Sequence, residues 1–204
     1  MASRSSEASA LARTVLLPID VQRGFDDPSW PPRWNGEMET NGRALLARWR
    51  AAGAPIVHVR HDSVQPGSSL APGLWGNDFR DGFAPLAGEP LVWKSVNSAF
   101  IGTDLDLRLR RLGAERIVAF GISTDMCVST TIRTGANMGW TMALVADACD
   151  CFDLPDGRGG TIPAQVIQDA HVATLAAEFC EVMTTAEATA KPKPAPATEA
   201  AVTA

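Results

Sequence analysis

Short apolar runs alternate along this chain with longer amphipathic segments, and this alternation restricts the possible folds more than any other feature. The apolar runs have the length of buried strands, and most follow a glycine or proline. The predicted strands cover residues 14–20, 55–60, 91–95, 116–121, 141–147 and 180–185. Pro18 lies inside the first run and removes one ladder donor, but we keep the strand because its flanks are strongly apolar.

The segments between these runs have helical periodicity. Leu45, Leu46 and Trp49 recur at helical spacing in a segment that stops at Gly53. A second helix is predicted to start with Thr103 as its N-cap and to stop at Gly113. The predicted helices cover residues 37–53, 103–113, 127–138 and 162–179.

Strands that alternate with helices imply right-handed crossovers and a parallel sheet that is covered on both faces. The predicted fold class is therefore α/β: a three-layer α/β/α doubly wound fold with a six-stranded, mainly parallel sheet in the order 3-2-1-4-5-6. We expect a flexible N-terminal segment over residues 1–12, one compact domain over 13–185 and a disordered Ala/Pro-rich tail over 186–204.

Composition excludes several functional classes. The formal net charge is −5 and no basic patch stands out, so we expect no nucleic-acid partner. No apolar stretch approaches the roughly 18–20 residues that span a bilayer, and the N-terminus has no hydrophobic signal core, so we expect no membrane partner and a cytoplasmic location. The four cysteines are then expected to be reduced thiols.

Reactive side chains stand at the predicted ends of three strands. Asp20 ends the first strand, Lys94 closes the third and Cys127 follows the fourth. In a doubly wound sheet, ligands bind at the carboxyl ends of the strands, near the point where strand order reverses. A carboxylate can take a thiol proton, and a helix start or a nearby ammonium can stabilise a thiolate. A cysteine at a helix start is also a common buried structural residue, so spacing alone leaves both interpretations open.

Three longer motifs narrow the choice. The segments "LPIDVQRGF", "WKSVNSAFIGTDLDLRLRRLG" and "RIVAFGISTDMCVSTTIRTGANMGW" occur in this order, and "TMALVADAC" follows them. Together they resemble the isochorismatase-like cysteine hydrolases over roughly residues 13–185. The resemblance implies that Asp20 is a general acid/base, that Lys94 holds the cluster together and keeps the thiol ionised, and that Cys127 is the nucleophile. It also implies a cis peptide bond at Ile122–Ser123 and an oxyanion hole formed by the N–H groups of Ser123 and Cys127.

The cysteine indicates acyl transfer. The resemblance implies cleavage of a C–N amide, ureido or lactam bond through a thioester, because family members that cleave a vinyl ether need no thiol. A vinyl ether hydrolase of the isochorismatase type remains the alternative enzyme, and a non-catalytic oligomeric scaffold remains the alternative of another class. The resemblance also implies a homodimer or homotetramer.

Metal-dependent members carry an Asp-x-His and a further His, which "HVRHDSVQPGS" does not reproduce. We therefore predict no metal and no cofactor. We expect His58 to lie in the core or pair within its strand, and His61 to face the cleft. Cys149, Cys151 and Cys180 are interpreted as structural. The predicted contacts of the small amide substrate are Gln22, Phe25, His61, Trp75 and Asn97.

Overall fold

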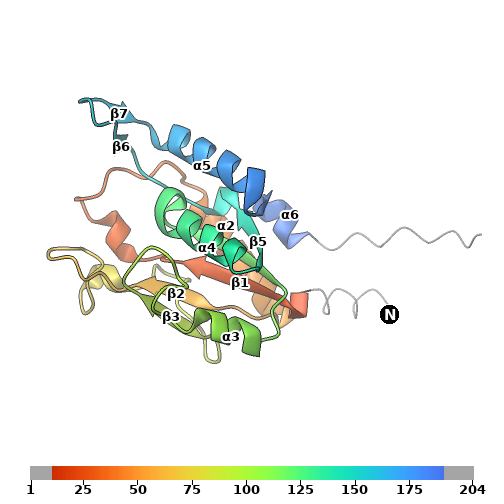
Figure 1. The fold of residues 1–204 in the computed structure, drawn as a ribbon. Coiled ribbons are helices and arrows are strands. Elements are labelled where there is room, and N and C mark those ends of the chain that lie inside the picture. Colours follow the sequence, from red (N-terminus) through yellow and green to blue (C-terminus); the bar gives the residue numbers. More distant parts are fainter. Residues whose placement is uncertain (1–10, 191–204) are drawn as a thin grey trace, which may run out of the picture.

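The computed structural model of the chain describes residues 11–190, in which a six-stranded parallel sheet carries helices on both faces (Figure 1). The strand order is β3-β2-β1-β4-β5-β8, so the predicted doubly wound sheet is confirmed. The predicted sixth strand is labelled β8 because a two-stranded hairpin precedes it. The strands of the sheet are β1 (Thr14–Ile19), β2 (His58–His61), β3 (Leu91–Lys94), β4 (Arg116–Gly121), β5 (Thr141–Val145) and β8 (Glu181–Met183). The hairpin consists of β6 (Leu154–Pro155) and β7 (Thr161–Ile162).

The helices form the two outer layers. One face of the sheet carries α2 and α6, which pack against each other, and the opposite face carries α3, α4 and α5 (Figure 1). Their bounds are α2 (Met38–Ala52), α3 (Leu105–Arg111), α4 (Ser129–Asn137), α5 (Ala164–Glu178) and α6 (Thr185–Thr189). Single 3₁₀ turns occur at η1 (Arg23–Asp26), η2 (Trp75–Asn77) and η4 (Ala146–Ala148), and a π-helical turn, η3 (Thr124–Val128), precedes α4. Throughout residues 11–190, every helix is too short or too polar to cross a lipid bilayer.

Pro18 is accommodated within the central strand. Leu16 and Asp20 both donate their N–H groups towards β2, to Pro55 O and Val59 O, and Pro18 lies between them on the same side. The missing donor therefore interrupts only the ladder between β1 and β2. The ladder between β1 and β4 runs unbroken over the whole length of both strands.

Two predicted boundaries were wrong. The predicted tail over 186–204 begins too early, because Thr184 and Glu187 form a reciprocal capping box and start α6. The Thr185 hydroxyl also donates to Asp147 at 2.8 Å, which fixes this helix to the domain. In addition, the N-cap of α3 is Asp104 rather than the predicted Thr103, so the helix begins at Leu105. The Thr103 hydroxyl still accepts from the Leu105 N–H at 3.3 Å. The remaining terminal predictions, over 1–10 and 191–204, lie outside the described residues.

Gly121 sets the separation of β1 and β4 at their carboxyl ends. Its φ is +141°, and a Cβ atom built there would lie 2.0 Å from Ile19 O. This contact is with the neighbouring strand, so glycine is needed to let β1 and β4 end side by side.

Candidate active site

Asp20, Lys94 and Cys127 meet at the carboxyl edge of the sheet. Lys94 Nζ lies 2.5 Å from Asp20 Oδ2 and 3.2 Å from Cys127 Sγ. The topology explains the meeting, because β1 and β4 are neighbours and the long Lys94 side chain reaches inward from β3 past the end of β2. The side chains of Asp20 and Lys94 are fully buried, and Cys127 retains 9% exposure.

The backbone turns sharply at two of these positions. Asp20 has a φ of +53°, the only positive φ among the described non-glycine residues, and it ends β1 by turning the carboxylate towards Lys94. Strained backbone of this kind concentrates at functional sites. After β4 the Ile122–Ser123 peptide bond is cis, and the chain enters the π-helical turn η3, which contains Cys127.

His61 completes the cluster around the Lys94 ammonium. Its Nδ1 lies 3.1 Å from Lys94 Nζ, so the prediction that His61 faces the site is confirmed. Burial, and then the Lys94 charge, lower the pKa of His61, so its neutral ring accepts a hydrogen bond from the ammonium. His58, in contrast, is fully buried and pairs with Glu89 at 2.8 Å, as expected of a core histidine.

The Lys94 ammonium occupies the position that a metal ion would need. Donor atoms of Asp20, His61 and Cys127 all lie within 4.8 Å of one another, which is close enough for a shared cation. Lys94 Nζ is within hydrogen-bond distance of all three residues. Although burial lowers the pKa of Lys94, the charge of Asp20 and the hydrogen bonds to Asp20 and Cys127 raise it, and the net shift is upward. The cluster is therefore built around an ammonium ion.

The electrostatics of the site oppose the prediction that Lys94 keeps the resting thiol ionised. Burial, and then the negative charge of Asp20, raise the pKa of Cys127, and Lys94 only partly opposes them. Asp20 Oδ1 is buried and has no hydrogen-bond partner among residues 11–190. The resting site thus pairs a protonated thiol with a carboxylate oxygen that is available to accept its proton.

A cavity of about 250 Å³ opens onto Cys127. Of the predicted substrate contacts, Phe25, His61 and Asn97 line it, as does Ser123. Trp30 also lines it and was missed as a contact, although it stands in the same segment as Phe25; the two rings lie 5.0 Å apart, edge to face. The remaining lining residues are Ser63, Val64, Gln65, Ser68, Leu70, Ser95 and Met126.

Two predicted contacts lie elsewhere. The Gln22 side chain is fully buried and bonds to backbone, donating to the carbonyls of His61 and Asn77 at 3.0 Å and accepting from the His61 N–H at 2.9 Å. It positions the end of β2. Trp75 is 59% exposed and lies beneath the Arg23 guanidinium, outside the cavity. Sequence reasoning assigned it to the cleft because its long loop is aromatic, but the loop turns that ring outward.

The other cysteines have no part in the cluster. Cys149 and Cys151 are fully buried, and their thiols donate to the carbonyls of Val145 and Ala164. Cys180 is half-buried at the start of β8, and all four thiols are free. This arrangement agrees with the structural role expected for these three residues.

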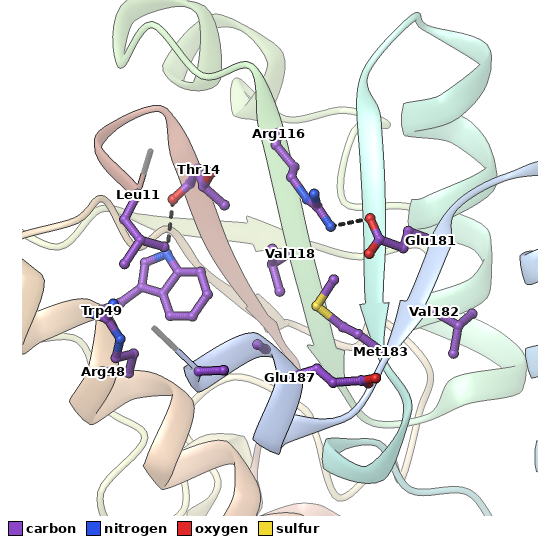
Figure 2. Close-up of a pocket in the computed structure, with 12 residues that line it drawn as sticks. Leu11, Thr14, Arg48, Trp49, Arg116, Val118, Glu181, Val182, Met183 and Glu187 are labelled. Atoms are coloured by element: carbon purple, nitrogen blue, oxygen red, sulfur yellow. Dashed lines mark hydrogen bonds and ion pairs between the residues drawn. The ribbon is translucent and has the colours of Figure 1, made fainter. Parts of the chain in front are cut away.

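A second, larger cavity lies at the opposite, amino edge of the sheet (Figure 2). Its volume is about 450 Å³, and Trp49, Val118 and Met183 form part of its wall. Figure 2 shows the ion pair between Arg116 and Glu181, at 2.5 Å, and the hydrogen bond from Trp49 Nε1 to Thr14 O. The described lining residues include neither a cysteine nor a histidine, so this part of the wall offers no thiol or imidazole for catalysis.

The fold and the site define a hydrolase with a buried carboxylate, ammonium and thiol. The isochorismatase domain model matches residues 14–187, and the chain belongs to the isochorismatase family. The isochorismatase family protein YrdC of Bacillus subtilis is 34% identical over 173 residues, which is 85% of this chain and 92% of that protein.

Two further similarities are to a solved structure and to a hydrolase. A crystal structure of an isochorismatase-family protein from Chromobacterium violaceum is 39% identical, has a TM-score of 0.83 and covers 87% of this chain and 92% of that one. Streptothricin hydrolase of Streptomyces noursei is 32% identical over 152 residues, which is 74% of this chain and 55% of that protein.

Proposed function

We propose that this protein is a cysteine hydrolase that cleaves a C–N amide, ureido or lactam bond of a small molecule through a thioester on Cys127. The observation that carries the proposal is the contact of one buried ammonium with both a carboxylate and a thiol, Asp20 and Cys127, at the base of a cavity. The similarity to streptothricin hydrolase supports hydrolysis by this arrangement.

The chemistry divides into two steps. In the first, Asp20 Oδ1 accepts the thiol proton while Sγ attacks the carbonyl carbon, and the N–H groups of Ser123 and Cys127 stabilise the oxyanion. The C–N bond then breaks, and Asp20 returns the proton to the leaving nitrogen. In the second, Asp20 takes a proton from water, hydroxide attacks the thioester, and the proton returns to Sγ as the acid leaves.

Lys94 is proposed to hold these charges in place. Its ammonium stays hydrogen-bonded to the Asp20 carboxylate and contacts Sγ, so the thiolate that forms during attack is opposite a fixed positive charge. A protonated resting thiol is compatible with this scheme, because proton transfer accompanies attack on a bound substrate. The raised pKa of Cys127 also protects the resting thiol from oxidation, since the thiolate is the reactive form.

The test is ammonia or amine release over a panel of small amides, ureido compounds and lactams. Cys127→Ala should reduce kcat for any compound turned over by at least about 10⁴-fold, because the nucleophile is lost. Cys180→Ala removes a half-buried thiol outside the cluster and is the matched control, with turnover expected to be unchanged. Turnover of a vinyl ether that survives Cys127→Ala would contradict the proposal and favour the isochorismatase reaction.

A further inference from the structure

We infer that the Cys127 cavity accepts an uncharged acyl group and excludes substrates that carry a carboxylate close to the scissile amide. The inference rests on the proposed function for the reaction itself. It adds to that proposal a statement about the charge of the substrate, which neither membership of the family nor similarity to a relative determines.

The lining of the cavity carries no formal charge. Its side chains are hydroxyls and amides, such as Ser63, Ser95 and Asn97, and apolar groups, such as Leu70 and Met126. None of the described lining residues is aspartate, glutamate, lysine or arginine. The single titratable ring, that of His61, has a lowered pKa and is neutral at pH 7.

The cation beneath the cavity has no donor left for a substrate. An ammonium group has three N–H donors. Those of Lys94 point to Asp20, Cys127 and His61, and the lysine side chain is fully buried. A substrate carboxylate would therefore lose its water and find only neutral hydroxyl and amide donors, because Lys94 has no free N–H and the described lining residues include no arginine. Burial of a carboxylate without a cationic partner is unfavourable.

The opposite side of the cavity favours apolar surface. Phe25 and Trp30 meet edge to face, and Phe152 supports both rings from behind, 4.9 Å from Trp30. The volume of about 250 Å³ lies below the range of roughly 300–1,000 Å³ typical of pockets for drug-sized ligands. The substrate that fits is a small, uncharged amide with an apolar acyl group.

Two alkylating reagents of nearly equal size test charge exclusion without requiring turnover. Iodoacetamide is neutral and iodoacetate is anionic, and both modify thiols by the same displacement of iodide. The rate ratio of iodoacetamide to iodoacetate at Cys127, read from the labelled peptide, should exceed the ratio for N-acetylcysteine by at least about 100-fold, as expected when a buried charge lacks its partner. Equal ratios for Cys127 and N-acetylcysteine would overturn the inference.

A charge introduced at the cavity mouth should reverse the exclusion. Gln65 is exposed and lines the cavity, so a longer cationic side chain can reach the opening without disturbing the core. Gln65→Arg should lower the Cys127 rate ratio by about tenfold or more, whereas Gln65→Met, of similar length and no charge, should leave that ratio near the unmodified value. A similar fall in both variants would show that size, and not charge, controls entry.

Hydrolysis of a matched pair separates this inference from the proposed function. Butyramide and succinamate differ mainly in a methyl group against a carboxylate, and kcat/KM should favour butyramide by at least about 100-fold. Preference for succinamate would overturn the charge rule and leave the hydrolase proposal standing. Loss of all amide turnover, together with a high alkylation ratio, would instead contradict the hydrolase proposal and leave the charge rule standing.

Discussion

The cavity at the amino edge of the sheet is the larger of the two, at about 450 Å³ against about 250 Å³, yet the smaller one contains the reactive groups. Each has an ion pair at 2.5 Å. The pair at the amino edge, Arg116 with Glu181, is 33% and 60% exposed, whereas Lys94 and Asp20 are fully buried. An exposed pair adds little to stability, and a buried pair must overcome a large desolvation cost.

The difference in burial between the two ion pairs indicates which edge of the sheet contains a functional site. A buried ammonium and carboxylate do not by themselves indicate a more stable protein than apolar side chains at the same positions would give. Such buried charges are found mainly at functional sites, where the charge takes part in the chemistry. The site is also where the fold departs from regular structure, with a positive φ at Asp20 and a π-helical turn at Cys127. The amino edge shows neither feature at Arg116 or Glu181, which lie in regular strands.

The largest expected difference between the two edges is in stability. Lys94→Met leaves the buried Asp20 charge unpaired and should lower the free energy of unfolding by about 3–5 kcal/mol. Arg116→Met removes one partner of the exposed pair and should cost no more than about 1 kcal/mol. Chemical denaturation of the two variants measures both values.

A double variant tests whether the loss of stability in Lys94→Met comes from the unpaired Asp20 charge. Asp20→Asn combined with Lys94→Met removes both charges and should recover part of the stability lost in Lys94→Met alone. If the losses of the two single variants simply add, the two groups do not interact as the structure indicates.

The next effect concerns the close approach of β1 and β4. Gly121→Ala would place a methyl group against Ile19 O and should destabilise the protein by more than about 2 kcal/mol. Gly139 is a matched control, because its φ of +88° is also positive but a Cβ there meets nothing within 4 Å. Gly139→Ala should cost only about 1 kcal/mol. Similar losses in thermal unfolding of both variants would mean that φ, and not the strand contact, requires glycine at 121.

The smallest effect is on the pH dependence of thiol labelling. Because the pKa of Cys127 is raised, the thiol stays protonated in the range where a free thiol of pKa about 8.5 has already ionised. Iodoacetamide labelling of Cys127 should therefore continue to accelerate above about pH 10, where labelling of a model-peptide cysteine of pKa about 8.5 has levelled off. Asp20→Asn removes the nearest negative charge and should move the Cys127 profile to lower pH. A plateau for Cys127 below pH 8 would contradict this assignment.

Much of this arrangement could be predicted from the sequence. The apolar runs and the residues that end them placed Asp20, Lys94 and Cys127 at one edge of the sheet, because the carboxyl ends of parallel strands share one edge. Asp20 and Cys127 meet for this reason. The interpretation of these residues as a reactive cluster came from the resemblance of the longer motifs. The sequence also separated His58, which is in the core, from His61, which faces the site.

The features that could not be predicted depend on long-range contacts, which leave no pattern in the nearby sequence. Gln22 is bonded to the backbone of residues 39 and 55 positions away, and nothing near it in sequence indicates this. Trp75 lies in a turn whose next residue, Gly76, packs directly against Gly24, and this contact is long-range. The ionisation of Cys127 has no local signal for a related reason, since the degree of burial and the charge of Asp20 influence its pKa and neither is encoded by spacing.

The most direct measurement is the mass of the Cys127 peptide from enzyme quenched with acid during turnover of an amide substrate. The proposed mechanism predicts an added mass equal to the acyl group on Cys127, removable by hydroxylamine and absent from Cys127→Ala. Steady turnover with no acyl adduct on Cys127, retained in Cys127→Ala, would contradict the account.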